Sequence, residues 1–426
     1  MKASALRKLF RSGFSTATGT TAREGAVSLL DQAVVSGANF LASIIVARVL
    51  TREGFGLYEL GFTIVVAVTN VQTALVSTPY TVYSPRLADS EQAAYAGSTL
   101  IHQLGLSAIA AVLLLAAGLA LAGGVGPGRL APIVNALALA IVLILLREYV
   151  RRICFAHLRM KTALVIDTIA MILQLGGLLL LARWGALSAP GAYLITGGAC
   201  GLASLIGIAA TRRLFAPRLA RAGQDLRSNW TLGKWALAST LGATASAELY
   251  PWFLAAFHGY AATGILGACN KVVFLANPIL LGLTNFLGPK AAHAYTRGRA
   301  SLNRVVTQAT FVVAVGMLAF AVLVALLSGW LLQVMYGSKY GGYERIVALL
   351  AVRHFITALN LPVNCGLLAV ERADIIFRSY LAGATVTLVL GVPLVYAAGI
   401  QGAAWAMVAS AAATTIFRHW RFWSKP

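Results

Sequence analysis

The chain has 426 residues, of which 59% are hydrophobic and 11% are charged, and its mean hydropathy is +0.79. Water-soluble globular domains carry about 25% charged residues, so this composition excludes a single water-soluble core and makes lipid the solvent. The net charge of +21 is high enough for a nucleic-acid-binding protein, but Lys and Arg lie mainly in alternate loops between apolar runs, a pattern that argues against nucleic acid.

The first segment, residues 1–25, is basic and rich in Ser and Thr. This composition fits an organellar transit peptide or a cytoplasmic tail, and the tail is favoured. Apolar runs of roughly 20 residues follow, the length that a helix needs to cross the hydrocarbon core, and they predict an all-α polytopic membrane protein. The twelve predicted spans are 26–47, 57–78, 99–121, 131–146, 163–182, 191–210, 235–257, 264–287, 305–327, 346–368, 376–397 and 400–417.

The distribution of basic residues sets the expected orientation. With both termini in the cytoplasm, the inner loops and tails hold about 26 of the 34 Lys and Arg residues and the outer loops about 6. Both termini are therefore expected inside.

The sequence contains an internal repeat. A hairpin of two apolar runs at 27–79 has a divergent copy at 237–289, in which Gly56 corresponds to Gly264. Transporters are often built from such repeats, with the substrate path between them. The expected organisation is a basic tail at 1–25, a six-helix lobe at 26–210, a basic cytoplasmic linker at 211–234, a second six-helix lobe at 235–417 and a basic tail at 418–426.

Ionisable groups inside the predicted spans are candidates for function because charge in lipid is costly unless it is paired or wet. The candidates are Asp31, Glu248, Lys271, Arg353 and His354. Uncharged polar groups that accompany them are Asn39, Asn70, Gln72, Asn270 and Asn360.

Four stretches, at 36–58, 259–268, 277–292 and 399–406, resemble the polysaccharide and O-antigen flippases of the multidrug/oligosaccharidyl-lipid/polysaccharide (MOP) superfamily. The resemblance implies a MATE-like fold of two V-shaped six-helix bundles that alternate between inward-open and outward-open forms. It also implies a cargo, a polyprenyl-diphosphate-linked oligosaccharide that crosses the bacterial inner membrane. Lipid II flippases and multidrug extruders share this superfamily, but twelve spans rather than fourteen weaken the lipid II alternative.

A diphosphate cargo requires fixed cations and amides along a wet groove, and Arg353 and Lys271 are the predicted cations. The alternatives are that Lys271 extends to the membrane interface and that Arg353 pairs with Glu248 or Asp31. The two acids either bind a coupling H⁺ or Na⁺ or serve as structural partners. His354 either joins a proton relay or is a hydrogen-bonding neighbour of Arg353.

The remaining features point away from an enzyme. The sequence contains no Walker A glycine loop for ATP, and its scattered cysteines lack a metal-ligand spacing, so neither a cofactor nor a metal is expected. The expected partners are the lipid-linked oligosaccharide, the bilayer, and a polysaccharide polymerase and glycosyltransferases. The alternative functions are a cation-coupled multidrug extruder of the same fold and a non-transporting membrane scaffold for polysaccharide synthesis.

Overall fold

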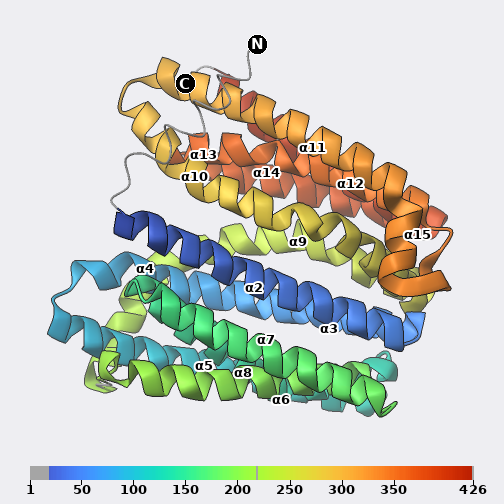
Figure 1. Cartoon of the computed structure of the whole chain (residues 1–426), viewed down its shortest axis with the longest axis horizontal. Helices are drawn as coiled ribbons and strands as arrows, with labels where there is room; N and C mark the ends of the chain where they lie inside the picture. The colour runs from blue at the N-terminus through green and yellow to red at the C-terminus, as the bar shows by residue number, and fades with distance from the viewer. Residues whose placement is uncertain (1–18, 217–218, 425–426) are drawn as a thin grey trace.

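The structure, a computed structural model, describes residues 19–216 and 219–424, in which every regular element is a helix (Figure 1). Ten helical segments within these ranges are long and apolar enough to cross a membrane. The chain is therefore an all-α multi-pass membrane protein, as the sequence predicts.

The first half of the chain, called the N-half, contains six long helices and five short elements. Its α-helices are α2 (Gly19–Val49), α3 (Arg52–Gln72), α4 (Thr78–Tyr83), α5 (Asp89–Ala122), α6 (Ala131–Ala156), α7 (Met160–Arg183) and α8 (Ala189–Thr211). A π-helical turn (Thr73–Ser77) joins α3 to α4, and 3₁₀ turns occur at Ser84–Arg86, Gly128–Leu130 and Arg212–Leu214.

The second half of the chain contains the longest helical segments. Its α-helices are α9 (Leu219–Val273), α10 (Asn277–Tyr295), α11 (Arg299–Tyr336), α12 (Glu344–Ala358), α13 (Asn360–Ala369), α14 (Ala373–Val386) and α15 (Val392–Trp423). A π-helical turn (Thr387–Gly391) precedes α15, and 3₁₀ turns occur at Phe274–Ala276 and Gly337–Tyr340.

Two of the ten apolar segments are hairpins that turn back at a glycine. Gly259 in α9 has φ 80° and Gly399 in α15 has φ 55°, a region that favours glycine. Thr263 Oγ1 donates to the carbonyl of Pro251 at 3.0 Å, so the chain after Gly259 returns along the chain before it. A Cβ on Gly402 would lie 1.8 Å from the carbonyl oxygen of Leu394, which shows the same reversal at Gly399. The described chain therefore makes twelve crossings, in agreement with the twelve predicted spans.

The helices form two layers, with α2–α8 in one and α10–α15 in the other, and α9 runs between them (Figure 1). We call the layer of α10–α15, together with the part of α9 after Ala236, the C-half. The start of α9 packs on the N-half, where Tyr95 Oη donates to Asn229 Oδ1 at 2.6 Å. The prediction of a linker loop at 211–234 is wrong in one respect, because residues 219–234 continue the helix and pack against α5.

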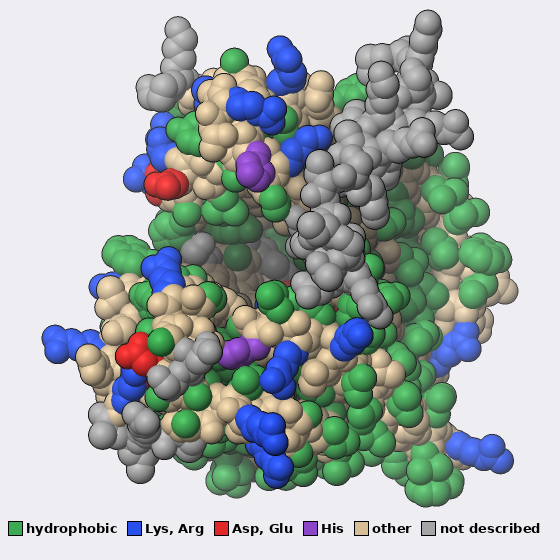
Figure 2. All heavy atoms as spheres, turned by 60° about the vertical axis from the view of Figure 1, so that its left-hand side comes forward, with side chains coloured by type: hydrophobic (Ala, Val, Ile, Leu, Met, Phe, Trp, Pro, Cys, Tyr) green, Lys and Arg blue, Asp and Glu red, His purple; other side chains and the backbone are tan. Residues whose placement is uncertain are grey.

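The two ends of the bundle differ. At the end where α2 begins and α15 ends, called the terminal end, a hollow separates the halves and Lys and Arg side chains surround it (Figure 2). At the opposite end the halves are in direct contact. A Cβ on Gly56 would lie 1.8 Å from the carbonyl oxygen of Tyr260, and a Cβ on Gly264 would lie 2.2 Å from that of Arg52. The two glycines that correspond in the internal repeat therefore meet at the interface, where only glycine allows α3 and α9 to approach so closely.

Cations also cross the interface at this opposite end. Lys339 Nζ donates to the carbonyls of Ala47 and Arg48, each at 3.0 Å, and also to that of Leu50, at the carboxyl end of α2. Arg48 Nε in turn donates to the carbonyl of Met335, at the carboxyl end of α11, at 2.6 Å. The last carbonyls of a helix lack partners within the helix and attract positive charge, so each half caps a helix of the other.

Candidate functional site

Two adjoining cavities lie toward the terminal end, one within the C-half and one between the two halves. The first, called the C-half cavity, has a volume of about 370 Å³ and is lined by α9, α10, α12, α13, α14 and α15. The second, called the interface cavity, has a volume of about 560 Å³ and is lined by α3, α9, α13 and α14. Both include Ala243, Asn364 and Tyr380 in their walls, so the two cavities are immediate neighbours.

Arg353, on α12, lines the C-half cavity and is half-buried. Its Nη1 donates to Asn270 Oδ1 at 3.5 Å. No carboxylate of the described residues lies within 4.0 Å of its guanidinium, so the alternative of an ion pair with Glu248 or Asp31 is not formed here. The cation is therefore held beside the cavity by a neutral partner.

Arg418 is a second cavity cation, although it lies in the predicted basic tail at 418–426. That assignment is wrong, because α15 continues to Trp423 and buries Arg418 to 1% exposure. Its guanidinium donates to Ser379 Oγ at 2.6 and 3.0 Å and to Asn364 Oδ1 at 2.7 Å. The sequence did contain an indication of this position. Arg418 directly follows the predicted span 400–417, and a helix can continue beyond the end of its apolar run.

The rest of the lining combines apolar side chains with neutral polar ones. Asn360 Nδ2 donates to Thr415 Oγ1 at 2.7 Å, and Asn70 Nδ2 in the interface cavity donates to Thr244 Oγ1 at 3.0 Å. His354 lines the C-half cavity. Further hydroxyl and amide groups of the C-half cavity come from Asn277, Thr284, Thr357, Asn364, Ser410 and Thr414. Glu248 is the one acid that lines either cavity in the described chain.

Lys271 does not line either cavity, and the prediction that it faces the cargo is not met in this conformation. It is 6% exposed, with its Nζ 3.4 Å from Glu59 Oε1 and 4.2 Å from the centroid of the Phe62 ring. The alternative of an extended side chain at the membrane surface is also wrong. Glu59 lies inside the predicted span 57–78, so a complete count of ionisable residues in the spans would have found it.

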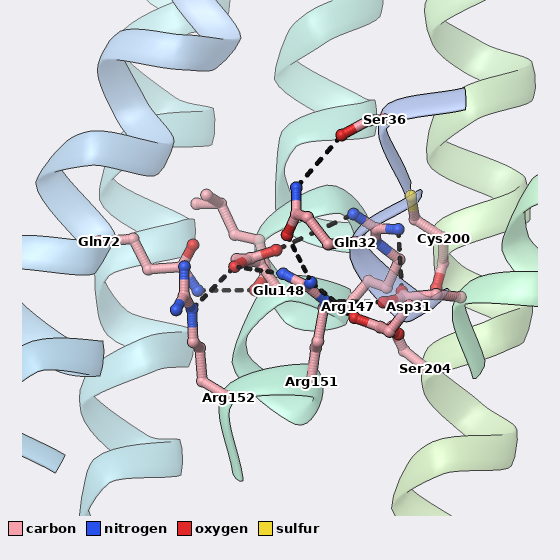
Figure 3. Close-up of polar contacts among 12 residues, drawn as sticks. Asp31, Gln32, Ser36, Gln72, Arg147, Glu148, Arg151, Arg152, Cys200 and Ser204 are labelled. Carbon is pink, nitrogen blue, oxygen red and sulfur yellow. Dashed lines mark hydrogen bonds and ion pairs between the residues drawn. The ribbon is translucent and has the colours of Figure 1, made fainter. Parts of the chain in front are cut away.

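Asp31 belongs to a buried ion cluster in the N-half (Figure 3). Its Oδ2 is 2.7 Å from Arg151 Nη2, and Arg151 Nε is 2.7 Å from Asp167 Oδ2. Arg147 Nη1 reaches Asp167 Oδ1 at 3.0 Å. The cluster joins α2, α6 and α7, so Asp31 has a structural partner. Asp167, which lies inside the predicted span 163–182, was missed from the candidates.

The same cluster continues along α6, where Arg152 Nε donates to Glu148 Oε1 at 2.9 Å. Three arginines and three carboxylates thus give it a formal charge of zero. Removing one partner from such a cluster leaves an uncompensated charge, so its members stabilise the N-half together.

Two other predicted residues lie away from the cavities. Gln72 is fully buried, and its Nε2 donates to Gln103 Oε1 at 2.8 Å and to the carbonyl of Leu145 at 2.7 Å. Asn39 is exposed on α2 and lines neither cavity. Both predictions assumed that any polar group in a span faces the cargo, whereas Gln72 joins α3 to α5 and α6.

Comparison with known proteins gives one family and one fold. The sequence profile of a family described as polysaccharide biosynthesis protein matches residues 21–287. No curated protein matches the sequence.

Several solved transporter structures share the fold. An inward-facing multidrug resistance MATE family transporter of the MOP superfamily superposes with a TM-score of 0.77 at 15% identity, over 93% of this chain and 98% of that one. An outward-facing MATE transporter gives 0.68 at 14% identity, over 94% and 95%. A MOP superfamily transporter from Pyrococcus furiosus, described as having a binding pocket of reverse polarity, gives 0.67 at 14% identity, over 94% and 95%. At these identities the likeness establishes the fold.

Proposed function

The chain belongs to the polysaccharide biosynthesis protein family, and because it also has the MOP transporter fold, we propose that it moves a polyprenyl-diphosphate-linked oligosaccharide across a membrane by alternating access. The observation that carries the proposal is the pair of cavity cations, Arg353 and Arg418. Within the described chain, neither has a carboxylate within 4.0 Å.

The chemistry of the cavity suits this cargo. A diphosphate needs fixed positive charge in a medium that solvates it poorly, and a guanidinium binds phosphate oxygens through two parallel hydrogen bonds. Sugar hydroxyls both donate and accept, as do the amides and hydroxyls that line the C-half cavity. The polyprenyl tail remains in the bilayer, where its burial costs nothing.

The conformation supports loading from the terminal end. A hollow separates the halves there (Figure 2), while Gly56 and Gly264 close the opposite end. The basic residues favour a cytoplasmic location for the terminal end, and the higher TM-score is that of the inward-facing MATE transporter. We infer that the cargo enters from the cytoplasm and leaves on the outer side of a bacterial inner membrane, where glycosyltransferases and a polymerase act before and after it.

The rival within the fold is a multidrug extruder. Extruders of cationic drugs need acids in the cavity, and here the described lining holds one acid, Glu248, against two arginines. The reverse polarity described for the Pyrococcus furiosus transporter shows that pocket charge varies among proteins of this fold. Glu248 remains the candidate for a coupling H⁺ or Na⁺, because Asp31 is already paired with Arg151.

The test is translocation by purified protein in liposomes. A polyprenyl diphosphate that carries a short fluorescent oligosaccharide serves as the cargo, and cargo that reaches the far leaflet is measured by quenching. We expect Arg353→Gln to slow translocation at least about tenfold, which corresponds to the loss of about 1.4 kcal/mol. Arg297→Gln, which removes an exposed charge at the terminal end, is the matched control and should stay near the wild-type rate. Folded Arg353→Gln protein that transports at the wild-type rate would contradict the proposal, and so would a scaffold-like protein that moves no cargo at all.

A further inference from the structure

Arg418 is a buried cation whose described hydrogen-bond partners are neutral. Its guanidinium contacts only neutral groups among the described residues, namely Ser379, Asn364 and the ring of Tyr380, whose centroid is 4.8 Å from Arg418 Cζ. A buried charge without a counter-charge is costly, and the ion cluster of the N-half shows that this chain pairs such charges elsewhere. The missing counter-charge is therefore best supplied by a ligand, and Arg418 lines the cavity that would hold it.

Arg418 and Arg353 lie at different depths. Thr415 Oγ1 on α15 donates to the carbonyl of Ile356 on α12, and Arg418 Nη1, further along α15, donates to Asn364 Oδ1 on α13. Because the later residue of α15 contacts the later residue of α12–α13, these segments run in the same direction. With this register, Arg418 lies about six residues closer to the terminal end than Arg353, which corresponds to about 9 Å at 1.5 Å per residue.

We propose that Arg418 is a second anion subsite, at the terminal end of the C-half cavity, which binds the diphosphate of the cargo before Arg353 does. The proposal rests on the proposed function, and it adds an order of events. The diphosphate first pairs with Arg418, and it then moves about 9 Å deeper to Arg353 while the sugars occupy the amide and hydroxyl lining.

A purely structural role for Arg418 is the competing explanation. Its hydrogen bonds join α13, α14 and α15, so its removal could simply loosen the C-half. Asn364→Asp separates the two roles. This change places a carboxylate where Asn364 Oδ1 now accepts from Arg418 at 2.7 Å, so the helix contact is kept or strengthened while the positive charge is cancelled.

The experiment measures equilibrium binding of geranylgeranyl diphosphate, and of the uncharged geranylgeraniol as a comparison, to the full chain in lipid nanodiscs, together with the melting temperature. We expect the wild type to bind the diphosphate at least about tenfold more tightly than the alcohol. Asn364→Asp and Arg418→Gln should each weaken diphosphate binding about tenfold or more, and Asn364→Asp should melt at or above the wild-type temperature. Arg353→Gln should retain diphosphate affinity within about threefold although it translocates at least about tenfold more slowly.

Each control changes the net charge by one unit, as the test variants do, but at a position outside the cavity. Arg421→Gln removes a positive charge from an exposed position on the same helix, and Gln224→Glu adds a negative charge at an exposed position of the terminal end. Both should bind the diphosphate as the wild type does. If Asn364→Asp keeps full affinity, or Arg353→Gln alone loses it, the Arg418 subsite is wrong and the proposed function stands. If the wild type does not prefer the diphosphate to the alcohol, the proposed function itself fails.

Discussion

The glycine contact at the opposite end makes a quantitative prediction for Gly56→Ala. The added methyl would lie 1.8 Å from the carbonyl oxygen of Tyr260 and 3.0 Å from Gly264 N, so α3 and α9 must move apart. Overpacking of this kind costs about 1–3 kcal/mol, and the cost falls only on conformations in which these helices touch. A bias of that size changes the ratio of two conformations by about 5- to 150-fold, and we expect the shift to favour opening at this end.

The assay is a pair of distance measurements between spin labels on the protein in nanodiscs. Labels at the exposed positions Val125 and Arg345 report the opposite end, and labels at the exposed positions Arg159 and Arg297 report the terminal end. We expect Gly56→Ala to add a population with a longer distance at the opposite end and a shorter distance at the terminal end. The wild type should show mainly the form that is open at the terminal end.

The control is Gly37→Ala, because an added Cβ at this helical glycine meets no atom within 4 Å. It makes the same gain of about 1 kcal/mol in helix propensity without a clash, so its distances should match the wild type. Gly264→Ala should reproduce the Gly56→Ala shift, since the two added methyl groups would enter the same contact. If folded Gly56→Ala protein shows unchanged distances, the close contact of α3 with α9 is not what closes the opposite end.

Three other substitutions test the remaining charged contacts. Asp167→Asn should lower the unfolding free energy by about 3–5 kcal/mol, because it leaves buried guanidinium charge uncompensated. Asp374→Asn, in an exposed ion pair, is the control and should cost about 0–1 kcal/mol. Denaturant titration of the two variants compares these losses. Lys271→Met should destabilise by about 3–5 kcal/mol and should be rescued by adding Glu59→Gln, again by denaturant titration. Lys339→Met should weaken the opposite-end contact by about 1–3 kcal/mol and lengthen the same spin-label distance, without effect on the affinity for diphosphate.

The number of crossings could be predicted from the sequence because each crossing needs a run of apolar residues whose length is set by the bilayer. The helix ends could not be predicted in the same way. A helix can extend beyond the hydrocarbon core, where its backbone hydrogen bonds stabilise it and hydropathy gives no sign of where it ends. α11 extends from Arg299 to Tyr336 where 305–327 was predicted, and the final helix continues through Arg418 to Trp423. Because the end of this helix was predicted too early, Arg418, which lines the C-half cavity, was assigned to the predicted tail at 418–426.

The partners of the charged residues could not be predicted from a single sequence, because they depend on which helices become neighbours. Lys271 and Glu59 lie in different halves, and Asp31 and Arg151 are 120 positions apart. Arg353 and Glu248 are charged residues that line the cavities as their predicted roles require, and their roles in binding and coupling stay predictions. The repeat did predict an interface, because Gly56 and Gly264 correspond in the alignment and meet in the fold.

The charges are divided unequally between the halves, and this division bears on how transport is driven. The buried charges of the N-half neutralise one another, so their hydration does not change when the cargo binds. In the C-half, neither Arg353 nor Arg418 has a described carboxylate within 4.0 Å, and closing the cavity at the terminal end would remove water from the half-buried Arg353. Dehydrating an uncompensated charge costs several kcal/mol, whereas a bound diphosphate supplies the counter-charge. We therefore expect the loaded protein to close at the terminal end more readily than the empty one, so that the charge of the cargo itself couples binding to the change of conformation.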